Sequence, residues 1–395
     1  MPRFALGAVF LCGTSVSCGA ELVEFPCDIR EGACQEHIFE ATTALRGDER
    51  VALPKVTFIS IEEHWELLDD EAPGEDAELI DAALVALRLR PKPEDRSSGG
   101  GDTVRGGFYT AGSDEVVVVD RGDLASSEWN KLLAHEFVHY LQDRAHDLLD
   151  YPRTSSDAQI AFRALLEGEA TYLGDRFEIE SSDSLDADLD WPELYRGQWG
   201  RVLSRARKGQ WDGISSWLPY TLGAEVYARG VDRALLLDSR ERGNVRGWLN
   251  GQPERPLDPM SCLPPLPPEG WRLEMLDRLG ASAVLARTLD VSTARAIGND
   301  RVAIYLREDE ETVVLWHLDT DEAEAADLAQ KLGGDLVDGR VVQLIMATRP
   351  ETEALFAGLE CGNEEALAAI DADFGRIGAY LEGLPTEASV LDLHP

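Results

Sequence analysis

The sequence predicts an α+β fold in two parts, and three observations lead to this prediction. Two β-rich runs flank a glycine-containing turn over residues 107–120, a pattern typical of a β-hairpin. Stretches with helical spacing of apolar residues follow the hairpin. A proline-rich stretch at 251–270 then marks the best domain boundary, and strand-like runs return after it. We therefore expect a mixed α+β domain at 51–255 and a small α+β domain at 270–395.

Each expected element rests on its own local pattern. Strands are expected where β-branched and aromatic residues cluster between turn residues, and helices where apolar residues recur every three to four positions. Asp123 and Ser126 are candidate N-caps of a helix that ends near residue 147, and residues 91–101 are expected to form a loop. The other expected helices cover 35–46, 75–89, 156–180, 191–207, 216–235, 321–333 and 364–382. The expected strands cover 56–60, 107–109, 115–120, 301–307, 312–317 and 341–347.

The first residues suggest an export signal. Residues 4–16 form an apolar run of signal-peptide length, which is shorter than the roughly 20 residues needed to span a bilayer. Cys18 follows small residues as in a bacterial lipobox, although Ser15 stands where leucine is usual. We expect 1–18 to be a signal peptide, with a lipid anchor at Cys18 that holds the protein at the outer membrane or in the periplasm. Plain secretion and a cytosolic chain are the alternatives. Residues 19–50 would then form a tether and an N-terminal segment.

Four cysteines follow the signal region, and an even number in an exported protein suggests two disulfides. Four cysteines allow three pairings. The local choice pairs Cys27 with Cys34 and Cys262 with Cys361. None of the four has the spacing of a redox or zinc-ribbon motif.

The charge balance excludes several classes of partner. The chain has 37 Lys+Arg and 74 Asp+Glu residues, which give a formal net charge of −37 and a pI of about 4.4. This field would repel nucleic acids and anionic membrane surfaces, and no basic stripe offsets it. Because of this charge, we expect no nucleic-acid partner. The apolar fraction of 44% is that of a globular chain rather than a disordered one.

The most specific motif is the sequence HEFVH at 135–139. His135 and His139 are four positions apart, so they lie on one helix face and can bind one Zn²⁺ at about 2.0–2.1 Å. Glu136 is displaced from this pair around the helix and can take a proton from a metal-bound water. The alternative is two solvated histidines on an amphipathic helix. The hairpin before the helix favours the metal site, because zinc peptidases hold extended substrates on an edge strand.

A catalytic zinc needs a third protein ligand, and the next helix supplies a candidate. Glu167 follows His139 at a distance that lets one helix end, a loop pass and a second helix pack beside the first. Gly168 disfavours a helix interior by roughly 1 kcal/mol, so we expect it where these two helices approach closely at the metal. Glu169 is the rival ligand, but it points about 200° away around the helix. A surface position or a pairing with Arg163 is expected for Glu169.

The two motifs together resemble the gluzincin group of zinc metallopeptidases. Within that group, HEFVHYLQD at 135–143 and ALLEGEAT at 164–171 are similar to a little-characterised set of exported bacterial and archaeal proteins. The hairpin, the Pro-Tyr pair at 219–220 and residues 296–301 fit the same set. The resemblance therefore covers roughly residues 100–350.

This resemblance implies a zincin-like catalytic domain and a role for each site residue. His135, His139 and Glu167 match the zinc ligands, and Glu136 matches the general base. Tyr220 is the candidate hydroxyl donor to the transition state. The implied reaction is zinc-dependent hydrolysis of a peptide bond in a peptide or protein substrate. No particular substrate follows from the resemblance.

Two departures from the family pattern leave a second function open. Arg144 stands where relatives carry glutamine. The relatives have a Leu-His-Pro sequence in their proline-rich stretch, whereas this chain has Asp258 in place of the histidine. If that histidine stabilises an oxyanion in relatives, its loss weakens hydrolysis here. The alternative function is a cell-surface binding or assembly protein that keeps the zincin fold with weak or no turnover. The intact HExxH motif and Glu167 argue against it.

Two further expectations concern residues near these motifs. Asp143 is placed one helical turn after His139, so it is expected either to orient that ring or to lie in solvent. The tryptophans are expected in the core rather than on a substrate platform, and they include Trp129, Trp211 and Trp217.

Overall fold

The computed structural model describes most of the chain as a mixed α+β structure, which confirms the expected fold class. It describes residues 24–69, 75–92, 106–122, 124–146, 148, 155–181, 189–231, 244–252, 260, 262–307, 311–337, 339–347 and 349–362. Several expected features lie outside these residues. They are the signal region with Cys18, most of the loop at 91–101, the N-cap Asp123, the stretch around Asp258 and the helix at 364–382.

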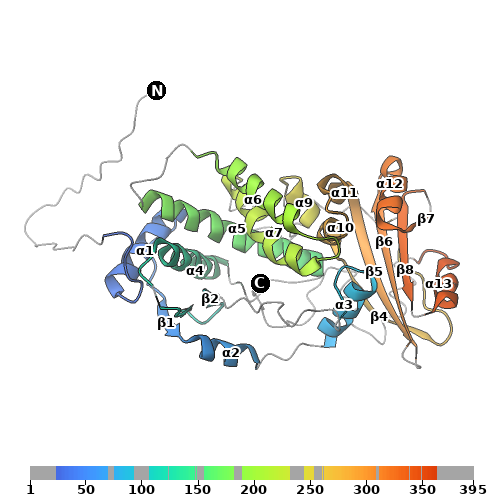
Figure 1. The fold of residues 1–395 in the computed structure, drawn as a ribbon, viewed down its shortest axis with the longest axis horizontal. Helices are drawn as coiled ribbons and strands as arrows, with labels where there is room; N and C mark the ends of the chain where they lie inside the picture. Colours follow the sequence, from blue (N-terminus) through green and yellow to red (C-terminus); the bar gives the residue numbers. More distant parts are fainter. Residues whose placement is uncertain are drawn as a thin grey trace, which may run out of the picture.

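In the N-terminal half, helix α4 (Ser127–His146) packs on a three-stranded sheet (Figure 1). Strand β1 (Lys55–Ile59) pairs in parallel with β3 (Glu115–Val119). Strand β2 (Gly107–Thr110) pairs antiparallel with β3, so the expected hairpin is confirmed. The order β1-β3-β2 leaves β2 at an edge of the sheet, next to α4. Phe137 of α4 is fully buried in the core between helix and sheet.

The N-terminal segment packs onto this layer. Helix α1 (Gly32–Arg46) contacts α4 and α5 (Ser156–Ser181). Cys27 and Ile29, which precede α1 in the stretch expected to be a tether, are buried in the same core. The expected disulfide between Cys27 and Cys34 is confirmed and ties this stretch to the first turn of α1.

Among the remaining helices of the N-terminal half, α7 (Trp211–Ala228) and α9 (Val245–Leu249) pack against α5. Helix α7 begins before residue 216, where we expected it to start. It packs along α5 on one side and against α6 (Trp191–Arg205) on the other. The other helices are α2 (Ile61–Asp69) and α3 (Glu75–Ala86).

Helices α5 and α7 cross with their backbones in contact at Gly168 and Gly223. A Cβ atom on Gly168 would lie 2.3 Å from the carbonyl carbon of Gly223, and one on Gly223 would lie 2.0 Å from the carbonyl oxygen of Ala164. Neither position has room for a side chain. The close approach expected at Gly168 is therefore confirmed, but its partner is α7 rather than α4. Gly174 is the glycine that faces α4, where its Cβ would lie 3.6 Å from the Cβ of His135.

A five-stranded antiparallel sheet forms the C-terminal part, with the order β4-β5-β6-β8-β7. The strands are β4 (Trp271–Asp277), β5 (Ile297–Arg307), β6 (Thr312–Thr320), β7 (Asp335–Val337) and β8 (Val341–Ala347). Four helices accompany them: α10 (Gly280–Thr288), α11 (Val291–Ala296), α12 (Glu322–Leu332) and α13 (Pro350–Ala357). The expected strands at 301–307, 312–317 and 341–347 are confirmed within longer elements. The expected pairing of Cys262 with Cys361 is also confirmed.

One hydrophobic core joins the two halves of the chain. It contains Leu165 and Leu222 from the helices of the N-terminal half and Val284 and Trp316 from the C-terminal half. In Figure 1, α10 lies between the end of α7 and the C-terminal sheet. The ranges expected as two domains therefore share buried apolar surface.

Hydrogen bonds also join the two halves at the start of α5. The backbone N–H of Ser156 donates to Oδ1 of Asp277 at 2.9 Å, and that of Asp157 donates to the carbonyl oxygen of Arg278 at 2.8 Å. These acceptors satisfy N–H groups that a helix leaves unpaired in its first turn. Among the described residues, no helix has both the length and the apolar character needed to cross a bilayer.

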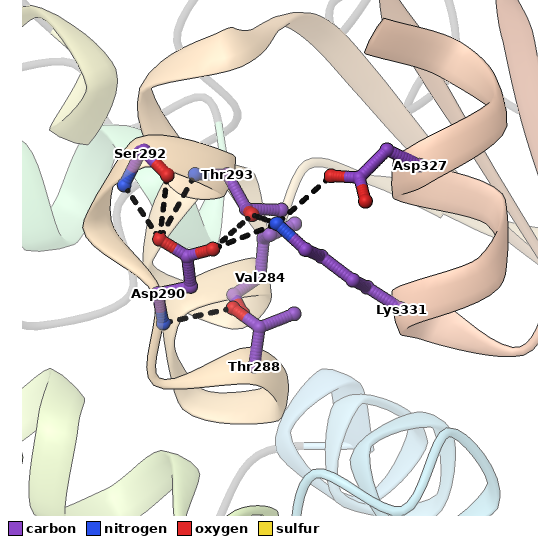
Figure 2. Close-up of polar contacts among 7 residues, drawn as sticks. All are labelled: Val284, Thr288, Asp290, Ser292, Thr293, Asp327 and Lys331. Carbon is purple, nitrogen blue, oxygen red and sulfur yellow. Dashed lines mark hydrogen bonds and ion pairs between the residues drawn. The ribbon is translucent and has the colours of Figure 1, made fainter.

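A polar cluster centred on Asp290 fixes α11 and α12 together (Figure 2). The Asp290 carboxylate accepts hydrogen bonds from the backbone N–H groups and the hydroxyls of Ser292 and Thr293. Nζ of Lys331 on α12 lies 2.8 Å from Asp290 and 2.8 Å from Asp327. Lys331 and the two hydroxyls together hold the pKa of Asp290 well below its usual value.

Replacing Asp290 with Ala is expected to lower the free energy of unfolding by about 1 kcal/mol, because the N-cap of α11 is lost. Lys331→Met is expected to have a smaller effect, since ion pairs near the surface contribute under about 1 kcal/mol. Urea unfolding of both variants beside the wild type measures the difference. The control is Asp335→Ala, which removes an exposed carboxylate from β7. A greater loss for Lys331→Met than for Asp290→Ala would contradict the capping role.

Candidate metal centre

Two helices bring the three expected ligands together. His135 and His139 lie one turn apart on α4, and Glu167 reaches them from α5. Nε2 of His135 lies 3.1 Å from Nε2 of His139 and 3.1 Å from Oε2 of Glu167. Nε2 of His139 lies 3.3 Å from the same carboxylate oxygen. Among the described residues, these three form the one group of histidine, cysteine and acidic side chains close enough to share a metal ion.

The three donor atoms fit a tetrahedral metal. Ligand atoms bound tetrahedrally at about 2.0–2.1 Å lie about 3.3 Å from each other, close to the observed separations. A set of two imidazoles and one carboxylate suits zinc, and it leaves a fourth position for water or substrate. His135 is partly accessible, whereas His139 and Glu167 are buried. The triad is therefore open on one side.

The electrostatics of the triad in the metal-free protein are dominated by one ion pair. Burial opposes ionisation of Glu167, but His139 and His135 outweigh it and hold the pKa of this carboxyl below its usual value. Burial also favours the neutral form of His139, yet Glu167 raises the pKa of this ring to about 9. A metal must therefore displace a proton from His139, so its affinity is expected to increase as the pH is raised and that proton is lost.

Glu136 lies beside the triad but outside it. Its carboxylate is buried against the β2 edge, where it accepts a hydrogen bond from the backbone N–H of Tyr109. Burial raises the pKa of Glu136, while the neighbouring imidazoles of His135 and His139 oppose the rise. Gly107 of β2 lies close to this side chain, since a Cβ there would be 3.5 Å from Cγ of Glu136. A carboxylate with a raised pKa beside a metal position can act as a general base and then as an acid.

A buried hydrogen-bond network orients the ring of His139 through its Nδ1 atom. Nδ1 of His139 lies 2.9 Å from Oε1 of Gln142. The amide nitrogen of Gln142 donates to the carbonyl oxygen of Leu166 at 3.0 Å and to Glu169 at 2.9 Å. Both of these partners are acceptors, so the amide oxygen must face the ring. Nδ1 of His139 must then carry the proton, which leaves the lone pair of Nε2 for a metal.

Glu169 continues this network instead of lying on the surface, which corrects our expectation. Its side chain is 2% exposed, and Oε1 accepts a hydrogen bond from Nε of Arg46 at 3.1 Å. Arg46 comes from α1 and also binds Asp48 and the carbonyl oxygen of Leu141. The expected pairing of Glu169 with Arg163 is wrong, because Glu169 pairs with Arg46 instead.

Asp143 plays neither of the two roles expected for it. Its Oδ2 accepts hydrogen bonds from the hydroxyl of Tyr109 at 2.6 Å and the backbone N–H of Gly112 at 2.7 Å. Its Oδ1 accepts from the backbone N–H of Leu148. Asp143 thus ties the hairpin turn to α4, and Gln142 is the residue that contacts His139. The signal that could have found Gln142 is its spacing of three residues from His139 on the same helix.

Replacing Gln142 with Leu is expected to weaken zinc binding by about 10- to 100-fold, because hydrogen-bond partners of metal ligands contribute about that much to affinity. The variant leaves the three ligands in place but removes the group that fixes the His139 tautomer. Competition with a coloured zinc chelator measures the affinity. Gln159→Leu, on the exposed side of α5, is the matched control. Equal zinc affinity of Gln142→Leu and the wild type would show that the hydrogen bond from His139 to Gln142 does not contribute to zinc binding.

Tyr220 from α7 contacts two of the triad residues. Its hydroxyl donates to Oε1 of Glu167 at 3.0 Å, and its ring stacks on His135 with centroids 6.1 Å apart and planes 18° apart. Burial and then the charge of Glu167 raise the pKa of Tyr220 well above its usual value, so the phenol stays protonated. In this structure the hydroxyl orients the carboxylate of Glu167. Its donation to a transition state stays a prediction.

Trp217 lies on the solvent side of the same stretch of α7. Its side chain is 56% exposed, and its ring centroid lies 6.2 Å from that of Tyr220. The expectation that Trp217 lies in the core is therefore wrong, whereas Trp211 is buried as expected. Helical periodicity places Trp217 one turn before Tyr220, and an exposed aromatic ring beside the triad can contact a substrate.

Comparisons with known proteins add no relative. No family model matches the chain, and neither the curated proteins nor the solved structures include a match.

Proposed function

We propose that this protein is a zinc-dependent peptidase of the gluzincin type. The observation that carries the proposal is the triangle of His135, His139 and Glu167, whose donor atoms have the separations of a tetrahedral zinc site. Glu136 next to it supplies the residue type that hydrolysis requires, and the sequence resemblance favours the same chemistry. The fold around the triad would then be zincin-like.

The chain's own residues divide the work of peptide hydrolysis. When bound, zinc supplies a Lewis acid and lowers the pKa of its water to about 7. Glu136 takes a proton at its carboxylate and passes it to the leaving amine. Gln142 holds His139 with its Nε2 toward the metal, and Tyr220 holds Glu167. Glu136 would therefore transfer protons, while Gln142 and Tyr220 would each hold one ligand in position.

Strand β2 is the proposed platform for the substrate. It is an edge strand of the sheet, and its Tyr109 N–H reaches Glu136. An extended peptide can add to such an edge through main-chain hydrogen bonds, largely independent of its side chains. Pairing along β2 would bring a peptide bond past Glu136 and the triad.

We also propose that the protein works outside the cytoplasm, anchored through Cys18 at the cell envelope or secreted. Two disulfides, Cys27–Cys34 and Cys262–Cys361, support this, because disulfides persist in oxidising compartments. The partner is then a peptide or protein substrate in that compartment.

Metal content tests the proposed function first. Elemental mass spectrometry of the purified protein should find about one zinc per chain, and Glu167→Ala should lose most of it. Glu180→Ala, near the end of the same helix, removes an exposed carboxylate and should keep the wild-type zinc content. A wild-type protein that binds no metal, even after zinc is added back, would rule out the peptidase.

A further inference from the structure

Arg163 on α5 is a partly buried side chain with two unpaired guanidinium nitrogens. Its Nε and Nη2 atoms are buried, and neither has a hydrogen-bond partner. The partner expected from the sequence, Glu169, binds Arg46 instead. No ion pair joins Arg163 to any acidic group among the described residues.

This arrangement is unusual on physical grounds. A guanidinium group stays protonated at all physiological pH values, so it cannot escape burial by losing its charge. Leaving its donors buried and unpaired costs more than leaving a neutral donor unpaired. Buried polar groups are nearly always satisfied, so the two unpaired nitrogens call for a partner such as water or a ligand.

Arg163 faces the candidate metal centre. It lies one helical turn before Glu167, so the two side chains share a face of α5. Its positive charge is also near Tyr220, where it opposes the rise in the pKa of that phenol. Tyr220 in turn contacts Glu167 and His135. The guanidinium is therefore near Tyr220, which itself contacts the triad.

We propose that Arg163 binds a carboxylate of the peptide substrate, close to the bond that is cleaved. The proposal rests on the proposed peptidase function and extends it to the substrate class. The planar fork of arginine matches a carboxylate with two parallel hydrogen bonds. Arg163 and Glu167 lie one turn apart on the same helix face, so a carboxylate bound by Arg163 would belong to a residue near the cleaved bond. The carboxylate is thus the C-terminus of the substrate or an acidic side chain near the cleaved bond.

The net negative charge of the chain bears on which substrates Arg163 can select. A net charge of −37 repels anionic peptides from the surface as a whole. The positive charge of Arg163 opposes that repulsion locally, and its two buried nitrogens are screened less by salt than surface charges are. Arg163 therefore selects an anionic group at one position rather than attracting acidic substrates in general.

Three peptide hydroxamates test the proposal on the zinc-loaded full-length protein. The hydroxamate group binds the metal in all three, and the remainder is Leu-Phe with a free carboxylate, Leu-Phe amide or Leu-Glu amide. Calorimetry should show that one of the two carboxylate compounds binds about 10- to 100-fold more tightly than Leu-Phe amide. Tighter binding of free Leu-Phe identifies a C-terminal carboxylate, and tighter binding of Leu-Glu amide identifies an acidic side chain.

Variants then assign the preference to the arginine. Arg163→Gln should abolish the difference between the compounds, and Arg163→Lys should keep part of it. Arg176→Gln is the matched control, because Arg176 lies on the same helix and pairs with the exposed Glu180. It should keep the wild-type preference.

Equal binding of all three compounds to the wild type would overturn the role of Arg163 and leave the peptidase proposal intact. This comparison needs no variant, so it holds even if Arg163→Gln fails to fold. A preference that persists in a folded Arg163→Gln variant would also overturn it. If none of the hydroxamates binds, the metal-dependent function itself fails and the substrate proposal fails with it.

Discussion

Glu136→Gln is expected to reduce peptide hydrolysis by about 10²- to 10⁴-fold while leaving the zinc content unchanged. Glutamine has nearly the same shape as glutamate, but its amide cannot take up a proton. Glu136 is not one of the three triad residues, so the metal site keeps its ligands. Turnover of a quenched fluorescent peptide library and elemental mass spectrometry measure the two quantities on one sample.

A matched control comes from the same helix. Glu128 lies exposed in the first turn of α4, and Glu128→Gln should keep both activity and zinc. If Glu136→Gln hydrolyses peptides as fast as the wild type, Glu136 is not the base. If the wild type binds zinc but turns over no peptide, the binding or assembly protein becomes the better account.

Gly223→Ala is expected to lower the free energy of unfolding by about 3 kcal/mol or more, at the upper end of overpacking effects. The new Cβ would lie 2.0 Å from the carbonyl oxygen of Ala164, and a backbone atom cannot rotate away. Helices α5 and α7 must separate. Because Glu167 is next to Gly168 at this crossing, zinc should be lost as well. Urea unfolding and zinc content measure the two effects.

The control for this substitution lies on the same helix. Gly213 in the first turn of α7 has no atom within 4 Å of where its Cβ would stand. Gly213→Ala should therefore be neutral or stabilise the protein by up to about 1 kcal/mol, as alanine favours a helix over glycine. Unfolding of Gly223→Ala at the same urea concentration as Gly213→Ala would show that the two helices are not in backbone contact.

The parts of the site that could be predicted are those encoded by spacing along one helix. The four-residue spacing of His135 and His139 determines that they share a face, and this needs no tertiary information. Glu167 could be named because a third ligand was needed and a helix with acidic residues followed. The reason for Gly168 could also be inferred, but not its partner. Whether α4 or α7 lies against it is decided by packing between residues far apart in sequence.

The rest of the site depends on contacts that no local pattern records. Arg46 reaches Glu169 across 123 positions of sequence, so neither residue carries a signal of the other. Trp217 is exposed, although a tryptophan is more often buried than not. Strand β4 was not predicted, although Trp271, Leu273 and Met275 alternate with polar residues in the sequence. The contacts of Arg46 and Trp217, by contrast, are tertiary effects that local preference does not record.

The hydrogen bonds at the start of α5 make the first turn of this helix depend on residues far away in the sequence. Ser156 begins the helix that carries Glu167, and its N–H is satisfied by Asp277, which lies 121 positions later in the chain. A chain that has emerged from the ribosome or an export channel only as far as the proline-rich stretch lacks this acceptor and the core beyond it. The first turn of the ligand helix therefore gains these two hydrogen-bond acceptors only when the residues around Asp277 are in place. The helix that carries Glu167 thus depends on a part of the chain 121 positions away.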